Sequence, residues 1–417
     1  MTRLEPAGRP GESRYYNDVS AVRTTRYCSQ QVRRRSRWWP LPFLILWSLA
    51  PAATARAQPA PPVPFFPLTV AWDTGLGATP AARPAFASGS AFVALRDRTL
   101  VAVDLETGQL RWRVNVAATI APAADDEFVY AYAGDALVAF ARDTGELRWE
   151  LALRTAPTAP MVARAGWLFV PAEGHLLAIN GRSGELVWRR DFDSRMGVRP
   201  VVDGDRLALG FDDGQVALVD VTTGATLWAQ RLGGAVSGLH MDAERVYAGS
   251  RDRFFYCLQT SNGRMAWRWR TGGDVVGAAL VDERHVYVVS LDNLMRALDR
   301  RHGAQRWHKP IKSRPLGGPV IAGDAVIVAG LTPEVHGFAR RDGAPLGPLR
   351  TAAEIAAPPY VHPRPLGRGG DLLVVLLADG RLVAARRRIE PPVVPLVVVP
   401  GVPVALTPPP GWSPPAS

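Results

Sequence analysis

The sequence predicts an all-β fold, an eight-bladed β-propeller of four-stranded antiparallel blades. Three observations predict this fold. A motif first seen as DLETGQLRW at 104–112 recurs in seven copies every 37 to 40 residues, the seventh without its tryptophan. Each unit contains four short strand-like stretches separated by Gly and Asp turns. The repeat region lacks the apolar spacing of helices, and four strands in about 40 residues are typical of a propeller blade.

Residues 1–57 are predicted to be a leader with a signal peptide. They hold ten Arg against three acidic residues, a net charge of +7, which is most of the chain's +11. The arginine cluster at 33–37 precedes the apolar stretch 38–50, and Ala55 and Ala57 supply the small residues of a cleavage site. We therefore expect an exported protein. Two prolines interrupt the apolar stretch, so we expect no transmembrane span in the mature chain, with an uncleaved anchor as the alternative.

The predicted propeller spans residues 65–388, after a short linker at 58–64. Its two ends predict how the ring closes. The segment 68–75 contains Trp72 but is preceded by no strands of its own, and the segment 371–388 supplies strands with no tryptophan after them. The N-terminal strand can therefore complete the C-terminal blade, which leaves no open sheet edge. Counting the strands in this way gives eight blades.

Glycine and tryptophan have different structural roles in the motif. Glycine accepts positive φ in the turn, and tryptophan is large and flat enough to cover the gap between adjacent blades. The turn role is assigned to Gly108, Gly145, Gly184, Gly224, Gly263 and Gly303. The bridging role is assigned to Trp112, Trp149, Trp188, Trp228, Trp267 and Trp307, with Trp72 as the closing member. Cys257 falls in a column of small residues before the turn, so we predict a buried substitute for alanine and not a nucleophile.

With this motif the chain resembles the PQQ-like propeller repeats, whose consensus hairpin is similar to A-x-D-x-x-T-G-x-x-x-W. The resemblance covers about residues 65–388. In blade number and mature length the chain is similar to the BamB-like outer-membrane assembly propellers of that family. The resemblance implies a non-enzymatic, monomeric scaffold for protein–protein interaction in the periplasm or at the outer-membrane periphery. Its partner would be an envelope or outer-membrane protein.

The same resemblance implies an alternative, a quinone-binding periplasmic protein related to PQQ-dependent dehydrogenases, with PQQ and calcium as cofactors. Those enzymes carry a vicinal cysteine pair, and some carry a C-x-x-C-H haem motif. This chain has cysteine only at 28 and 257, so neither feature is possible. The seven histidines form no short-spaced cluster of the kind that binds zinc. We therefore predict no catalytic residues, no metal site and no cofactor.

Two segments supply candidate partner-binding residues. In a column next to the inner strand most blades carry small residues, but two carry Arg83 and Arg199. We expect these two arginines to form a cationic patch at the channel entrance that could hold a carboxylate or an acidic peptide; the alternative is two solvated arginines on the rim. The blade connection at 189–200 has an exposed-looking mixture of residues, and its candidates are Phe192, Arg195 and Met196.

Outside the leader the charges nearly balance, because removing +7 from +11 leaves +4. No basic stripe with stacking aromatics is present, so we expect no nucleic-acid partner. Residues 389–417 form a Pro-rich C-terminal tail, with ten prolines in its last 27 residues. Such a segment is predicted to be extended, either as a ligand for another protein or docked on the propeller.

Overall fold

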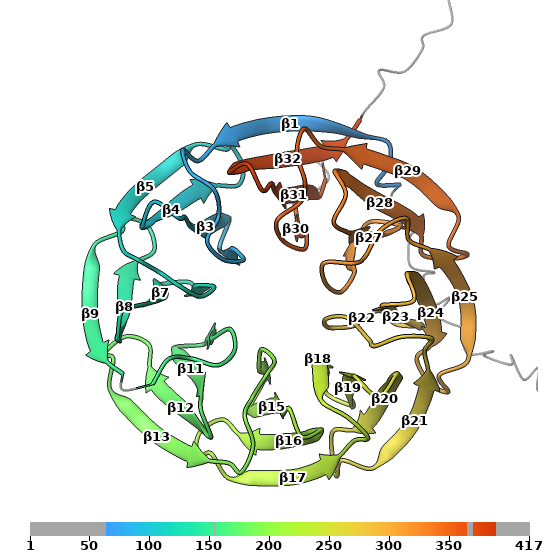
Figure 1. Cartoon of the computed structure of the whole chain (residues 1–417), viewed down its shortest axis with the longest axis horizontal. Helices are drawn as coiled ribbons and strands as arrows, with labels where there is room; N and C mark the ends of the chain where they lie inside the picture. Colours follow the sequence, from blue (N-terminus) through green and yellow to red (C-terminus); the bar gives the residue numbers. More distant parts are fainter. Residues whose placement is uncertain (1–63, 154, 365–369, 389–417) are drawn as a thin grey trace, which may run out of the picture. The chain divides into compact units, whose positions relative to one another are not determined.

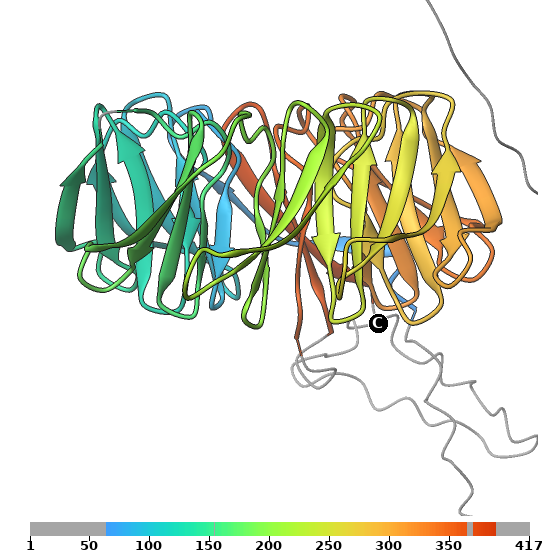
Figure 2. The same ribbon diagram turned by 90° about the horizontal axis from the view of Figure 1, so that it is seen from below.

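A computed structural model describes residues 64–153, 155–364 and 370–388. The predicted leader, all but the last residue of the linker, and the Pro-rich tail lie outside these ranges. The described residues form eight four-stranded antiparallel sheets arranged in a ring (Figure 1), which confirms the predicted eight-bladed propeller. Seen from the side, the ring is a short cylinder with its strands running between the two faces (Figure 2). Across the described ranges, no helix is long and apolar enough to cross a membrane.

Each blade runs from a short inner strand to an outer strand on the circumference. Blades 1 to 7 begin at β2, β6, β10, β14, β18, β22 and β26, and blade 8 comprises β30 to β32 with β1. The inner strands are β2 (Ala85–Ala87), β6 (Ala123–Ala124), β10 (Val162–Arg164), β14 (Val201–Asp203), β18 (Val236–Met241), β22 (Leu280–Val281), β26 (Val320–Ala322) and β30 (Tyr360–His362). The second strands are β3 (Ser90–Ala94), β7 (Phe128–Ala133), β11 (Trp167–Ala172), β15 (Arg206–Gly210), β19 (Arg245–Ser250), β23 (His285–Ser290), β27 (Ala325–Ala329) and β31 (Leu372–Leu376).

The remaining two strands of each blade carry the sequence motif between them. The third strands are β4 (Thr99–Asp104), β8 (Ala136–Ala141), β12 (His175–Asn180), β16 (Gln215–Asp220), β20 (Phe254–Gln259), β24 (Leu294–Asp299), β28 (Glu334–Ala339) and β32 (Arg381–Arg387). The outer strands are β5 (Leu110–Asn115), β9 (Leu147–Ala152), β13 (Leu186–Asp191), β17 (Thr226–Arg231), β21 (Met265–Arg270), β25 (Gln305–Pro310), β29 (Pro345–Arg350) and β1 (Leu68–Gly75).

The hydrophobic core lies between the blades. The second and third strands are rich in Val, Leu, Ala and aromatic residues, and most of their side chains are buried. These side chains form eight clusters, and each cluster combines residues from two neighbouring blades. Burial of apolar surface therefore stabilises every junction of the ring separately.

The motif tryptophans join each blade to the next. The indole N–H of Trp72 donates to the carbonyl oxygen of Leu105 at 3.0 Å. Gly108 has a φ of +73°, and a Cβ there would lie 2.6 Å from the Trp72 ring. The same arrangement recurs at six of the seven other junctions, where the tryptophans donate to carbonyl oxygens of Arg142, Gly181, Val221, Thr260, Arg300 and Arg340. Glycine at this position therefore allows both the positive φ of the turn and the close approach of the indole ring.

A column of small residues in the third strands makes room for the tryptophans. Trp112 pairs with Ala102, Trp267 with Cys257 and Trp72 with Ala384. Directly paired residues in antiparallel strands project from the same face of the sheet, so a small partner leaves space for the indole. Cys257 is fully buried, and burial raises the pKa of its thiol to about 12. The buried, inert thiol agrees with its predicted role as a substitute for alanine.

The first and last strands of the ring pair directly, as the sequence predicts. β1 pairs antiparallel with β32 in the eighth sheet. Arg381 donates two hydrogen bonds to the Asp73 carboxylate, at 2.9 and 2.6 Å. The side chain of Phe66, just before β1, lies over Gly337 in blade 7. The N-terminal segment therefore completes one blade and contacts the blade before it.

Candidate functional site

Most of the segments that surround the central cavity lie on one face of the propeller. Strands alternate in direction within a blade, so the connections between blades lie on the same face as the turns between second and third strands. The segments next to the inner strands of blades 1 and 3 to 7 border a cavity of about 830 Å³. This volume falls within the range of about 300–1,000 Å³ that is usual for ligand sites. We call it the central cavity.

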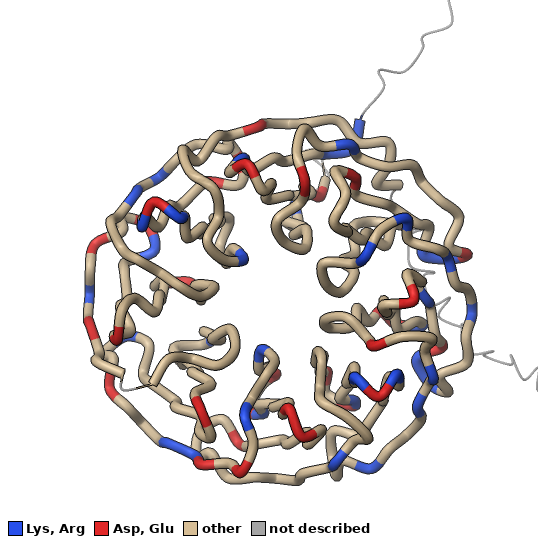
Figure 3. The backbone as a smooth tube through the Cα atoms, in the orientation of Figure 1, with Lys and Arg blue, Asp and Glu red and all other residues tan. Residues whose placement is uncertain are grey.

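Five arginines line the central cavity, and each comes from a different blade. They are Arg83, Arg164, Arg199, Arg251 and Arg314, and all five are exposed. Asp274 is the one acidic residue of the lining, so the formal charge of the wall is five minus one, or +4. None of the ion pairs formed within the described ranges involves these five arginines. Figure 3 shows that few charged residues lie on the innermost segments of the ring.

The two arginines that the sequence singles out lie in this same cavity, on opposite parts of its wall. Arg83 precedes β2 in blade 1, and one guanidinium N–H donates to the carbonyl oxygen of Leu316 in blade 7 at 3.0 Å. Arg199 precedes β14 in blade 4 and is exposed to the solvent in the cavity. The surrounding wall removes part of its hydration and lowers the pKa of its guanidinium. Arg199 therefore carries a positive charge that protein groups do not compensate.

The wall in blades 5 to 7 carries Arg251, Asp274 and Arg314 together with several glycines. Gly238, Gly277 and Gly317 all line the cavity. A Cβ at Gly238 would collide with the backbone of Gly277, and one at Gly317 would lie 2.5 Å from the ring of Pro358. At Gly277, which aligns with Arg83 and Arg199, a Cβ would collide with the backbone of Gly318, so the neighbouring inner strands leave room only for a small residue there. Two of the five cavity arginines thus lie in blades 5 to 7, so the positive charge is spread around the wall.

Three of the cavity arginines were not predicted from the sequence. Arg314 lies in the connection before β26, Arg251 lies in the turn after β19, and Arg164 ends β10 at the opposite end of an inner strand. They occupy different positions of the repeat, so no single column brings them together. A search for arginines in the blade connections, at the ends of the inner strands and in the turns after the second strands could have found them.

The connection at 189–200 is less exposed than the sequence suggests. Met196 is fully buried and forms a β-bridge with Phe211, so it is not part of a contact surface, contrary to expectation. Phe192 is half-buried against Phe211, with ring centroids 5.0 Å apart. Arg195 is exposed, but its guanidinium is paired with Asp212 at 3.2 Å. The repeat signals this burial, because Met196 aligns with the apolar positions 236, 275 and 355.

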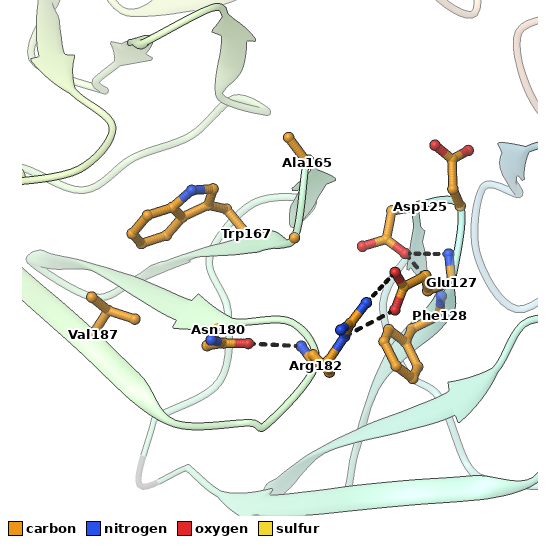
Figure 4. Close-up of a pocket in the computed structure, with 10 residues that line it drawn as sticks. Asp125, Glu127, Phe128, Ala165, Trp167, Asn180, Arg182 and Val187 are labelled. Atoms are coloured by element: carbon orange, nitrogen blue, oxygen red, sulfur yellow. Dashed lines mark hydrogen bonds and ion pairs between the residues drawn. The ribbon is translucent and has the colours of Figure 1, made fainter.

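A second cavity, of about 580 Å³, lies between blades 2 and 3 on the opposite face (Figure 4). Its carboxylates already have partners. Asp125 accepts from two backbone N–H groups and from the hydroxyl of Tyr130, and Glu127 is paired with Arg182. This arrangement ties the two blades together. It leaves less free charge for a ligand than the central cavity does.

Similar ion pairs link blades elsewhere on the same face. Arg340 of blade 7 donates to Asp282 of blade 6 at 2.8 Å, and the hydroxyl of Tyr287 donates to the same carboxylate at 2.9 Å. Burial alone would raise the pKa of Asp282, but the hydrogen bonds from Arg340 and nearby backbone groups outweigh it and lower the pKa. These buried charges act across blade junctions, so we assign them a structural role.

The central cavity does not fit PQQ bound with calcium. Calcium takes six to eight oxygen ligands, usually with several carboxylates. The cavity wall offers one carboxylate, Asp274, and no aromatic ring on which a planar quinone could stack. Within the described ranges, no three His, Cys, Asp or Glu side chains are grouped closely enough to hold a metal ion. The wall therefore lacks the oxygen ligands that calcium would need.

Comparison with known proteins shows a match to one family model along the ring. The family model described as outer membrane protein assembly factor BamB matches three overlapping segments, 68–166, 134–234 and 212–385. Together these segments run from β1 into β32. The outer membrane protein assembly factor BamB of Alkalilimnicola ehrlichii is 28% identical over 203 residues, which cover 45% of this chain and 50% of the relative. The chain thus spans about half the length of such curated relatives.

Some enzymes are also similar to this chain. The tetrathionate hydrolase of Acidithiobacillus ferrooxidans is 26% identical over 298 residues, covering 65% of this chain and 55% of the hydrolase.

Among solved structures, BamB from Moraxella catarrhalis has a TM-score of 0.66 at 18% identity, covering 76% of this chain and 99% of that one. Quinohemoprotein alcohol dehydrogenase from Comamonas testosteroni has a TM-score of 0.63 at 13% identity, covering 78% and 77%. At such identities the structural likeness concerns the fold.

Proposed function

Because this chain belongs to the family of the outer membrane protein assembly factor BamB, we propose that it is an exported, non-enzymatic scaffold that supports the assembly of outer-membrane proteins. The observation that carries the proposal is the match of the family model along the whole ring, from residue 68 to residue 385. The proposed partner is an envelope or outer-membrane protein, and the proposed location is the periplasm or the outer-membrane periphery.

The architecture supports a scaffold role. Eight separately stabilised junctions hold the blades, and the inner strands with the segments next to them surround a cationic cavity. Binding residues on loops held by a rigid ring suit a protein that positions partners. A scaffold of this kind needs exposed recognition groups but no reacting groups.

Deletion of the gene in the source organism tests the proposal. We expect lower amounts of β-barrel proteins in purified outer membranes, with restoration by the wild-type gene, measured by quantitative mass spectrometry. Inner-membrane proteins serve as the internal control. Unchanged outer-membrane protein levels in the deletion strain would contradict the proposed function.

The alternative, a quinone-binding protein related to PQQ-dependent dehydrogenases, is separated by a direct binding measurement. Purified protein is mixed with PQQ and calcium, passed over a desalting column and scanned for the absorbance of bound quinone. We expect no retained chromophore, because the cavity wall lacks calcium ligands and stacking rings. Retention that requires calcium would favour the alternative instead.

A further inference from the structure

We propose that the central cavity binds an acidic peptide segment of a protein partner, whose carboxylates pair with the cavity arginines. This inference rests on the proposed scaffold function and adds the chemistry of the ligand and its place on the ring. It starts from the wall itself, which carries five arginines and one aspartate. Arginine presents N–H groups in a fork that matches the two oxygens of a carboxylate.

The arginines are available for a ligand. All five are exposed, and none takes part in an ion pair formed by the residues that the structure describes. Elsewhere on the ring, arginines such as Arg300 and Arg340 are paired with aspartates of the neighbouring blade. The blade-joining arginines and the cavity arginines are thus two distinct sets. An anion in the cavity would supply the negative charge that the cavity arginines lack as a partner.

The positions of Arg83 and Arg199 favour binding over simple solvation. The hydrogen bond from Arg83 to the carbonyl oxygen of Leu316 fixes its guanidinium and leaves other N–H groups free. Arg199 is partly stripped of water by the surrounding wall, so its charge is less well hydrated than that of an arginine on the outer rim. Both features lower the cost of ordering a carboxylate against either arginine.

The rest of the wall favours an extended peptide as the source of the carboxylates. In blade 6, half-buried Gly277 and exposed Ala278 line the cavity and leave part of the backbone accessible. Peptide N–H and C=O groups of a bound strand can form hydrogen bonds with such a wall. The arginines come from five blades, so they suit several carboxylates spaced along a chain. A volume of about 830 Å³ leaves room for a short segment and not for a folded domain.

The test uses the purified full chain and a fluorescein-labelled Glu- and Asp-rich hexapeptide, with binding followed by fluorescence anisotropy. We expect saturable binding that weakens as sodium chloride is raised. The matched peptide with Gln and Asn in place of the acids should not bind. Free citrate separates a small tricarboxylate from a peptide source. Equal binding of the neutral peptide, or binding of citrate without the acidic peptide, would overturn the proposal.

Variants test whether the peptide binds in the central cavity. Arg199→Gln breaks no hydrogen bond among the described residues and should weaken the acidic peptide about tenfold, the effect of losing one charge-assisted hydrogen bond. Arg83→Gln/Arg199→Gln should weaken it further. The control Arg190→Gln/Arg301→Gln removes two exposed arginines outside the cavity and should bind like wild type. Circular dichroism and melting temperature verify folding. Wild-type affinity in Arg199→Gln would overturn the proposal, whatever the gene deletion shows about outer-membrane assembly.

Discussion

Phe66 lies over Gly337 and occupies the space that a motif tryptophan fills in the other blades. In blades 1 to 6 and 8, a tryptophan on the outer strand pairs with a residue of the third strand. In blade 7 that pair is Gly337 with Gly347. The ring of Phe66 comes in from the N-terminal segment, close enough that no Cβ fits at Gly337. A residue from outside the repeat thus compensates for the missing tryptophan.

Phe66→Ala is therefore expected to destabilise the propeller by about 2–4 kcal/mol, as for other large aromatic residues truncated at a packed site. The measurement is the free energy of unfolding from urea titration. Val70→Ala on the neighbouring strand is the control, because Val70 is 50% exposed. Gly337→Ala should also destabilise, and the double variant should lose less than the sum of the two single losses. Equal stability of Phe66→Ala and Val70→Ala would refute this packing role.

Gly108→Ala is expected to cost more stability than positive φ alone explains. Gly108 (φ +73°) and Gly89 (φ +77°) have similar backbone conformations, but only a Cβ at Gly108 meets Trp72, at 2.6 Å. Gly89→Ala should lose about 1 kcal/mol from backbone strain. Gly108→Ala should lose about 2 kcal/mol more, because the indole must move. Urea titrations of the two variants give the comparison, and similar losses would show that glycine serves the turn only.

Acid should weaken the propeller partly through Asp292. Burial opposes its ionisation, but hydrogen bonds from Arg296 and Ser290 outweigh this effect and lower its pKa to about 2. Because the unfolded value is about 3.9, the stabilisation is complete above about pH 4 and is lost as the pH falls toward 2. Asp292→Asn should lose about 1–2 kcal/mol at pH 7, reduced by solvent screening.

The check on Asp292 is the pH dependence of the unfolding free energy. Between pH 5 and pH 2, Asp292→Asn should lose less stability than wild type does. Asp193→Asn, at an exposed aspartate of a blade connection, is the control and should follow the wild-type curve. Parallel curves for wild type and Asp292→Asn would show that this carboxylate does not contribute to acid unfolding.

Cys257 should be unreactive in the folded protein. Its thiol is buried and its pKa is raised to about 12, so almost no thiolate forms at pH 8. Native protein is treated with iodoacetamide, digested and examined by mass spectrometry for label on the peptide containing Cys257. We expect labelling only after unfolding in guanidinium chloride. Labelling of the native protein at the rate of a free peptide thiol would contradict the assigned packing role.

The fold could be predicted in detail because seven copies of the motif indicate the same arrangement of strands and turns. Spacing alone placed each turn glycine and each tryptophan, and Trp72 at the start predicted how β1 closes the ring. Phe66 escaped prediction because it belongs to no repeat unit. Its role depends on the absence of tryptophan at position 347, which only the packing of two distant segments reveals.

The site could be predicted only in part. Arg83 and Arg199 stood out as exceptions in a column of small residues, and both line the central cavity. Met196 was misjudged because its loop looks polar, although the register of its bridge to Phe211 places it in the core. Arg251 and Arg314 share no repeat position with the predicted pair. Their convergence follows from the curvature of the ring and not from local sequence.

The pairing of β1 with β32 also sets the order of events during synthesis. Asp73 and Arg381, which meet in the last blade, are separated by 308 positions in the chain. The first strand of the ring, β1, therefore remains unpaired until the last strand, β32, is available. Until then the partly made ring has two unpaired edges, open to other chains. A factor that shields unpaired strand edges would thus act on this protein until β1 and β32 have paired.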